Sequence, residues 1–191
     1  MDLFADELRQ YGIEPDENMK KLTVYHVLTM TNGMARHPIM DAEWLKNYLA
    51  EPVVAEPGTE FLYNSSGSCL LGAIVKKKTG KGMREFLKEF LFDKIGIDGE
   101  RFQIFRFPDG YDAEPGTASV TEDNLRLAIL FMNYGNWNGE QIIAEDWMHM
   151  AMSCQISTEP NGGTEDYRHG YGFQLWNSAI PGVYRFDGGQ G

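Results

Sequence analysis

The chain has 191 residues, of which 42% are hydrophobic and 13% aromatic, enough for one domain with a sizeable apolar core. Its formal net charge at pH 7 is −11, which argues against nucleic acid or an anionic membrane as the main partner. No window holds the roughly 20 apolar residues that a membrane-spanning helix requires, and no signal peptide opens the chain. The compartment stays open between the cytoplasm and the cell envelope.

The first part of the chain predicts short helices separated by turns. Residues 1–22 are acidic and rich in turn-forming residues, and Thr23 is placed as the N-cap of the helix that follows. His26 lies within that helix, where a structural hydrogen bond is favoured over a catalytic role. Asp41 then precedes a further short helix with apolar residues at helical spacing.

The stretch 56–80 carries the clearest local signals. It opens with a Pro-Gly-Thr turn, continues through a short aromatic, strand-like piece and a small polar cluster, and enters a helix that Gly80 ends. This pattern places Tyr63 at the start of a helix. The amide of Asn64 and the hydroxyl of Ser65 follow it directly.

The second half predicts helices first and strands last. Residues 83–91 have apolar residues at the spacing of one buried helical stripe, whereas 98–118 have few periodic positions and predict a loop. Ser119 and Glu122 have capping-box spacing, which predicts the start of the next helix. From Tyr171 the apolar residues alternate with small or polar ones, which is typical of a strand.

Several of these segments, in the same order along the chain, resemble motifs of the serine beta-lactamase and penicillin-binding-protein family. Tyr63-Asn64-Ser65 resembles a variant of the family's tyrosine motif, and residues 171–176 resemble its G-Y-G-[YF]-x-[WF]-W run. The resemblance covers nearly the whole chain and implies an α+β, beta-lactamase/transpeptidase-like fold. Residues 1–168 would form the helical lobe, and residues 169–191 the incomplete start of the returning antiparallel sheet.

The same resemblance implies a set of site residues. Tyr63 would be the general base or acid of an acyl-enzyme reaction, with Ser65 as a hydrogen-bonding partner beside it. Asn64 would contact the substrate, and Asp187 and Gly188 would belong to the edge strand that flanks the acyl group. No metal or other cofactor is expected, and the expected partner is a small molecule with an ester, amide or lactam carbonyl.

The motif that supplies the family's nucleophile is absent from this sequence. In the family a serine of an S-x-x-K motif attacks the carbonyl, and no serine here has a lysine three residues later. Lys78-Thr79-Gly80 spells the family's K-T-G, but its place at the predicted end of a helix indicates capping instead. Phe186-Asp187-Gly188 stands where K-T-G is expected and lacks the cation.

These observations predict a fragment of a beta-lactamase-like serine hydrolase that is inactive alone. Its parent would act on a beta-lactam, a D-alanyl peptide, an ester or an amide. The alternative is a non-catalytic binding or sensor module derived from the same fold, and a metal hydrolase is a distant third because the four histidines lack metal-site spacing. A lone lobe would expose apolar surface, which predicts self-association or marginal stability.

Overall fold

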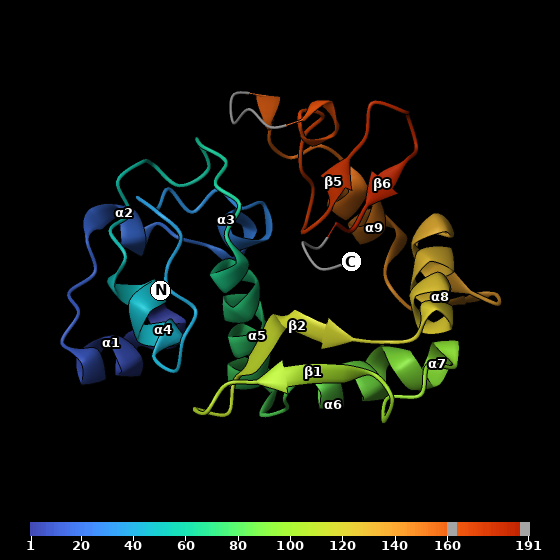
Figure 1. The fold of residues 1–191 in the computed structure, drawn as a ribbon, viewed down its shortest axis with the longest axis horizontal. Helices are drawn as coiled ribbons and strands as arrows, with labels where there is room; N and C mark the ends of the chain where they lie inside the picture. The colour runs from blue at the N-terminus through green and yellow to red at the C-terminus, as the bar shows by residue number, and fades with distance from the viewer. Residues whose placement is uncertain (160–163, 188–191) are drawn as a thin grey trace.

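The computed structural model describes residues 1–159 and 164–187, without the side chains of residues 113–115. The fold is α+β, with long helical stretches and short strands (Figure 1). Its helical segments are η1 (Asp2–Phe4), α1 (Ala5–Tyr11), α2 (Glu17–Lys20), α3 (Val24–Leu28), α4 (Trp44–Ala50), α5 (Ser65–Thr79), α6 (Met83–Leu87), η2 (Lys88–Phe92), α7 (Asp93–Ile95), α8 (Thr121–Met132), α9 (Glu145–Met152) and η4 (Glu165–Tyr167).

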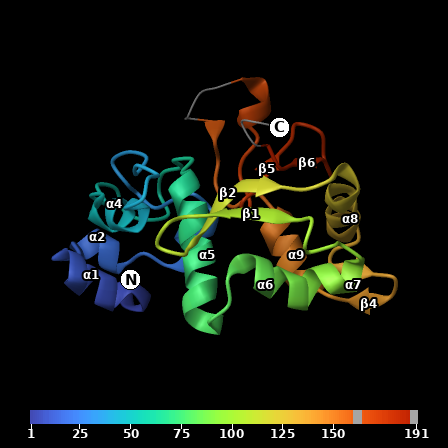
Figure 2. The same ribbon diagram turned by 60° about the horizontal axis from the view of Figure 1, so that its bottom comes forward.

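The strands of the described residues form three antiparallel pairs. They are β1 (Gln103–Arg106) with β2 (Asp112–Ala118), β3 (Asn136–Trp137) with β4 (Glu140–Gln141), and β5 (Trp176–Asn177) with β6 (Tyr184–Arg185). Helix α5 lies between the N-terminal helices α1–α4 and the β1–β2 hairpin (Figures 1 and 2). Among the described residues, no helix is both long and apolar enough to cross a membrane.

Helix α5 ends at Gly80, as the sequence predicts, but it begins at Ser65, within the polar cluster that was expected to precede it. The Asn64 side chain accepts a hydrogen bond from the Gly67 amide, which caps the start of the helix, and Gly80 ends it at φ 75°. Lys78 therefore lies in the last turn, where a cation complements the helix dipole. The neighbouring Lys77 forms an ion pair of 2.6 Å with Glu7, which ties α5 to α1.

The first core cluster forms where α4 and α5 meet. Trp44 and Tyr48 of α4 are fully buried there, together with Cys69 and Ala73 of α5. The Trp44 ring also stacks on Phe107, with 5.3 Å between ring centroids. This packing fixes α5 against the N-terminal helices, because fully buried aromatic rings dominate the energetics of a core.

The predicted buried stripe over residues 83–91 is wrong at Phe90, which is 49% exposed. The helix does not run regularly through this stretch, because a π-helical turn, η2, interrupts it after α6. A π turn inserts an extra residue and so rotates the following side chains. Phe92 and Ile95 are buried in the second core cluster in consequence, beside Leu130 of α8.

The segment that was expected to be a loop contains the β1–β2 hairpin. Its register shifts between Ile104 and Phe105, so the alternating pattern of a regular strand is broken. The predicted capping box is also wrong. Helix α8 has Val120 as its N-cap, and the Ser119 hydroxyl lies 2.7 Å from the Asn124 side-chain oxygen.

The predicted strand from Tyr171 is much shorter in the structure. Tyr171 makes isolated bridges to Ile156 and to Trp176, and the chain turns between Tyr171 and Trp176 before β5 begins. Gln174 in this turn has φ 60°, a left-handed conformation that interrupts a strand. The β5–β6 pair then places Trp176 opposite Arg185.

We predict that Trp44→Ala lowers the free energy of unfolding by about 3–5 kcal/mol, because it removes a fully buried ring from the first core cluster. The matched control is Trp147→Ala, which removes a ring that is 43% exposed and should cost about 1 kcal/mol or less. Urea unfolding with an unchanged m-value measures both losses. Equal losses for the two variants would show that Trp44 does not anchor this cluster.

Candidate active site

Tyr63 lies in the extended segment that leads into α5. The Leu62 amide donates to the Met30 carbonyl at 2.8 Å, and the Asn64 amide donates to the Met30 sulfur at 3.2 Å. The residues on both sides of Tyr63 are therefore held against the chain that follows α3. The Tyr63 side chain itself remains partly open to solvent, with 38% of its surface exposed.

The Tyr63 ring packs against aromatic side chains from the C-terminal part of the chain. It stacks on Trp176 with 5.7 Å between ring centroids and meets Tyr171 edge-on at 6.4 Å. Phe61, two residues earlier, contacts the same two rings. Tyr63 thus stands where the start of α5 meets the segment that leads into β5.

The surroundings of Tyr63 raise the pKa of its phenol above the ordinary value. Burial against the neighbouring rings is the larger cause, and the negative charge of Asp187 is the second. Both causes disfavour tyrosinate, so the phenol keeps its proton at neutral pH. In this arrangement Tyr63 can donate a hydrogen bond or a proton, and a nearby cation would be needed to make it a base.

Asp187 belongs to a small polar group beside these rings. Its carboxylate accepts a hydrogen bond from the Tyr167 hydroxyl at 2.6 Å and pairs with the Arg185 guanidinium at 3.4 Å. Arg185 also lies over the Tyr167 ring, 5.1 Å from its centroid. The hydrogen bond to Asp187 is the main reason that the pKa of Tyr167 is raised.

Asn64 is buried, with only 1% of its surface exposed, and its contacts are structural. Its side-chain oxygen accepts from the Gly67 amide and from the Ser66 hydroxyl, and its side-chain nitrogen contacts the Met34 sulfur at 3.4 Å. Ser65 is half-buried in the first turn of α5. The predicted roles of Asn64 with substrate and of Ser65 beside Tyr63 stay predictions.

The structure brings Tyr63, Asn64, Ser65 and Asp187 to the same region, while Gly188 lies outside the described residues.

His26 has the structural role that the sequence favoured, since its ring nitrogen accepts from the Thr23 amide at 3.2 Å. Burial lowers the pKa of His26.

Sequence reasoning missed two residues that contact the neighbours of Tyr63 or the elements that hold it. Tyr167 lies in a segment that reads as a polar, glycine-rich loop, so nothing marked its ring as a neighbour of Trp176, 4.9 Å away. Gln174 carried no signal beyond the alternating pattern around it. Trp176 had one signal, its place in the run that resembles the family.

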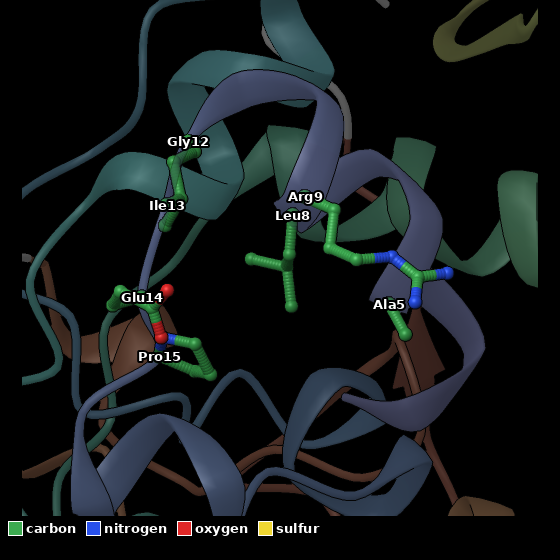
Figure 3. Close-up of a pocket in the computed structure, with 7 residues that line it drawn as sticks. All are labelled: Ala5, Leu8, Arg9, Gly12, Ile13, Glu14 and Pro15. Carbon is green, nitrogen blue, oxygen red and sulfur yellow. The ribbon is translucent and has the colours of Figure 1, made fainter.

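A surface hollow of about 320 Å³ lies elsewhere, on the N-terminal side of the molecule (Figure 3). Residues of α1 and of the chain just after it line the hollow, and the Leu8 side chain points into it. It includes none of the predicted site residues. Across residues 1–159 and 164–187, no group of three or more His, Cys, Asp or Glu side chains is arranged to hold a metal ion.

Comparison with known proteins defines the class to which this fold belongs. A candidate 6-aminohexanoate-dimer hydrolase from Bacillus anthracis superposes on 98% of this chain with a TM-score of 0.73 and 18% identity. An octameric penicillin-binding protein homologue from Pyrococcus abyssi superposes on 91% of this chain with a TM-score of 0.63 and 19% identity. The fold is that of the beta-lactamase and penicillin-binding-protein class, and this chain covers 54% and 50% of those two structures.

The family model described as Beta-lactamase matches residues 5–191, and the chain belongs to this family. A curated relative, the monacolin J acid methylbutanoyltransferase of Aspergillus terreus, is 29% identical over 108 residues. That match covers 49% of this chain and 26% of the relative. The predicted family and the predicted α+β fold class are thereby confirmed.

We predict that Asp187→Asn lowers the pKa of Tyr63, because it removes a negative charge that opposes ionisation of the phenol. The pKa of Tyr63 should stay raised above its ordinary value, since burial remains. NMR titration of ¹³C-labelled tyrosine measures it, with Tyr63→Phe identifying the resonance. The control is Tyr111, whose pKa burial and other carboxylates raise, and whose titration should not move. An unchanged Tyr63 titration in Asp187→Asn would contradict the electrostatic link.

Proposed function

We propose that this chain forms the helical lobe and the start of the returning sheet of a serine hydrolase that works through an acyl-enzyme. The observation that carries the proposal is the partly exposed Tyr63 at the start of α5, stacked on Trp176 from the returning segment. A proton donor and acceptor at such a junction can serve a nucleophile held beside it. The proposed division is 1–168 for the lobe and 169–191 for the sheet portion.

In this proposal Tyr63 exchanges a proton with the serine nucleophile and with the leaving group. Its raised pKa suits the donor step, and the lysine of an S-x-x-K motif would lower that pKa for the acceptor step. None of the 191 residues belongs to such a motif. We infer that the full reaction needs a serine and a lysine beyond those present in these residues.

The other site residues have supporting roles in the same proposal. Ser65 would hydrogen-bond near the Tyr63 hydroxyl, and the buried Asn64 would fix the start of α5. Asp187, which follows β6, would flank the acyl group. Asp187 stands where the family has a cation, and it pairs with the nearby Arg185 guanidinium, so this edge leaves no unpaired cation among the described residues for a substrate carboxylate. An uncharged ester, amide or lactam therefore suits this edge better.

Acyl transfer to an alcohol is the second reaction that we consider. The curated relative is named as a methylbutanoyltransferase, and such an enzyme differs from a hydrolase only in the acceptor of the acyl group. Both reactions use the same acyl-enzyme, so Tyr63 would have the same role in each.

We predict that the 191-residue chain is not labelled by a fluorescent penicillin or a serine-directed fluorophosphonate. A longer product of the parent gene that carries S-x-x-K should be labelled, and Tyr63→Phe there should slow labelling by about 10²–10⁴-fold. Tyr184→Phe is the control, because it removes the hydroxyl of a tyrosine with similar exposure, 36%, on β6. Gel fluorescence over time measures the rates.

Two outcomes would overturn this proposal. Labelling of the 191 residues alone would place the nucleophile on a serine outside any S-x-x-K motif. A parent gene without in-frame S-x-x-K codons upstream, together with unlabelled protein, would favour the non-catalytic binding or sensor module.

We also propose that the chain self-associates through α8. Leu125, Ile129 and Met132 have the spacing of one helical face and are 57%, 37% and 75% exposed. The net charge of −11 opposes association, and salt screens that repulsion.

Sedimentation velocity should therefore show larger species as salt is raised. Met132→Glu should abolish them, whereas Val54→Glu, at a 67% exposed position elsewhere, should not.

A further inference from the structure

Gln174 has a backbone conformation that a side chain normally disfavours. It lies in the turn that leads into β5, and its φ is 60°. Glycine adopts this left-handed region at little cost, whereas other residues persist there only when their surroundings hold them. The contacts of the Gln174 side chain show what holds it.

These contacts join three parts of the chain. The side-chain nitrogen donates to the carbonyls of Val27 and Leu28 at the end of α3, at 3.2 and 3.1 Å. The side-chain oxygen accepts from the Ser68 hydroxyl in α5 at 2.6 Å. The backbone amide of Gln174 donates to the same Leu28 carbonyl at 3.1 Å. Gln174 thus donates hydrogen bonds to the Val27 and Leu28 carbonyls at the end of α3, where helix carbonyls lack partners within the helix.

Each partner of Gln174 leads to one side of the aromatic stack. The end of α3 continues into Met30, whose carbonyl and sulfur hold the residues on both sides of Tyr63. Ser68 lies in the first turns of the helix that Tyr63 precedes. On the other side, Trp176 follows Gln174 by two residues and stacks on the Tyr63 ring.

We propose that Gln174 is a positioning residue that holds Trp176 against Tyr63. The side chain fixes the turn before β5 to α3 and α5, and the ring of Trp176 is carried into contact by that turn. The hydrogen bonds do not depend on the proposed function. The link from Gln174 to catalysis does rest on it, through the role of Tyr63.

Gln174→Gly provides the main test. Glycine adopts this backbone conformation without strain, and its backbone amide can still donate a hydrogen bond to the Leu28 carbonyl. It lacks the side chain that reaches Val27 and Ser68. The pKa of Tyr63, followed by NMR of ¹³C-labelled tyrosine, should fall toward the ordinary value of about 10 as Trp176 uncovers the ring. Tyr111, in the first core cluster, should titrate as before.

Asn138→Gly is the matched control. Asn138 also has a left-handed backbone, at φ 52°, in the turn between β3 and β4. This variant relieves the same kind of backbone conformation without touching the aromatic stack, so the pKa of Tyr63 should not change. If the pKa of Tyr63 fell in both variants, the cause would be a general loosening of the protein, and the proposal would be overturned.

Two further variants keep the test decisive. Ser68→Ala removes a single hydrogen bond and serves if Gln174→Gly does not fold; it should shift the pKa of Tyr63 in the same direction by less. Gln174→Gly should still lower that pKa in an Asp187→Asn background, because it acts through burial and not through the carboxylate. A folded Gln174→Gly protein with an unchanged Tyr63 titration would overturn the proposal, as would loss of the effect in the Asp187→Asn background.

Failure of this inference can be told apart from failure of the proposed function. If Gln174→Gly lowers the pKa of Tyr63 but Tyr63→Phe leaves labelling of the parent protein unchanged, the positioning holds and the catalytic role fails. If Gln174→Gly leaves the titration of Tyr63 unchanged but labelling depends on Tyr63, the catalytic role holds and the positioning role of Gln174 fails.

Discussion

The stacking of Tyr63 on Trp176 is the contact on which the site depends. It joins the start of α5 to β5, two parts of the chain that are far apart in sequence. The Tyr63 side is fixed by bonds to Met30 and by the buried Asn64 cap. The Trp176 side lies on a short strand, and its position depends on the rings of Phe61, Tyr167 and Tyr171 around it and on the turn before it. The side-chain hydrogen bonds of Gln174 fix that turn.

The local chain signals were sufficient to predict α5 and the place of Tyr63. Gly80 acts through contacts within a few residues, and such a cap can be read from sequence. The Asn64 cap was not predicted, although an Asn before a helix is a cap signal. The β1–β2 hairpin and the π turn could not be read, because the register shift and the extra residue break the periodicities on which such reading relies.

The same distinction applies to the candidate site. Tyr63 and its two successors were found because a contiguous motif carries them. Tyr167 and Gln174 were not found, because their relevance arises from long-range contacts to Asp187 and to α3. The family resemblance placed Asp187 near the site, and the raised pKa of Tyr63 gives that placement a physical consequence.

The electrostatics of Tyr63 indicate what a complete site must add. Lowering a tyrosine pKa from about 10 to about 7 requires about 4 kcal/mol of preference for the charged form. The positive end of α5 can supply only about 0.3–1 kcal/mol, and burial and Asp187 act in the opposite direction. A single cation about 4 Å away supplies about 4 kcal/mol at an effective dielectric constant near 20. One lysine close to the phenol therefore supplies most of the requirement, which the raised pKa of Tyr63 makes larger than about 4 kcal/mol. Without such a cation Tyr63 is a proton donor only.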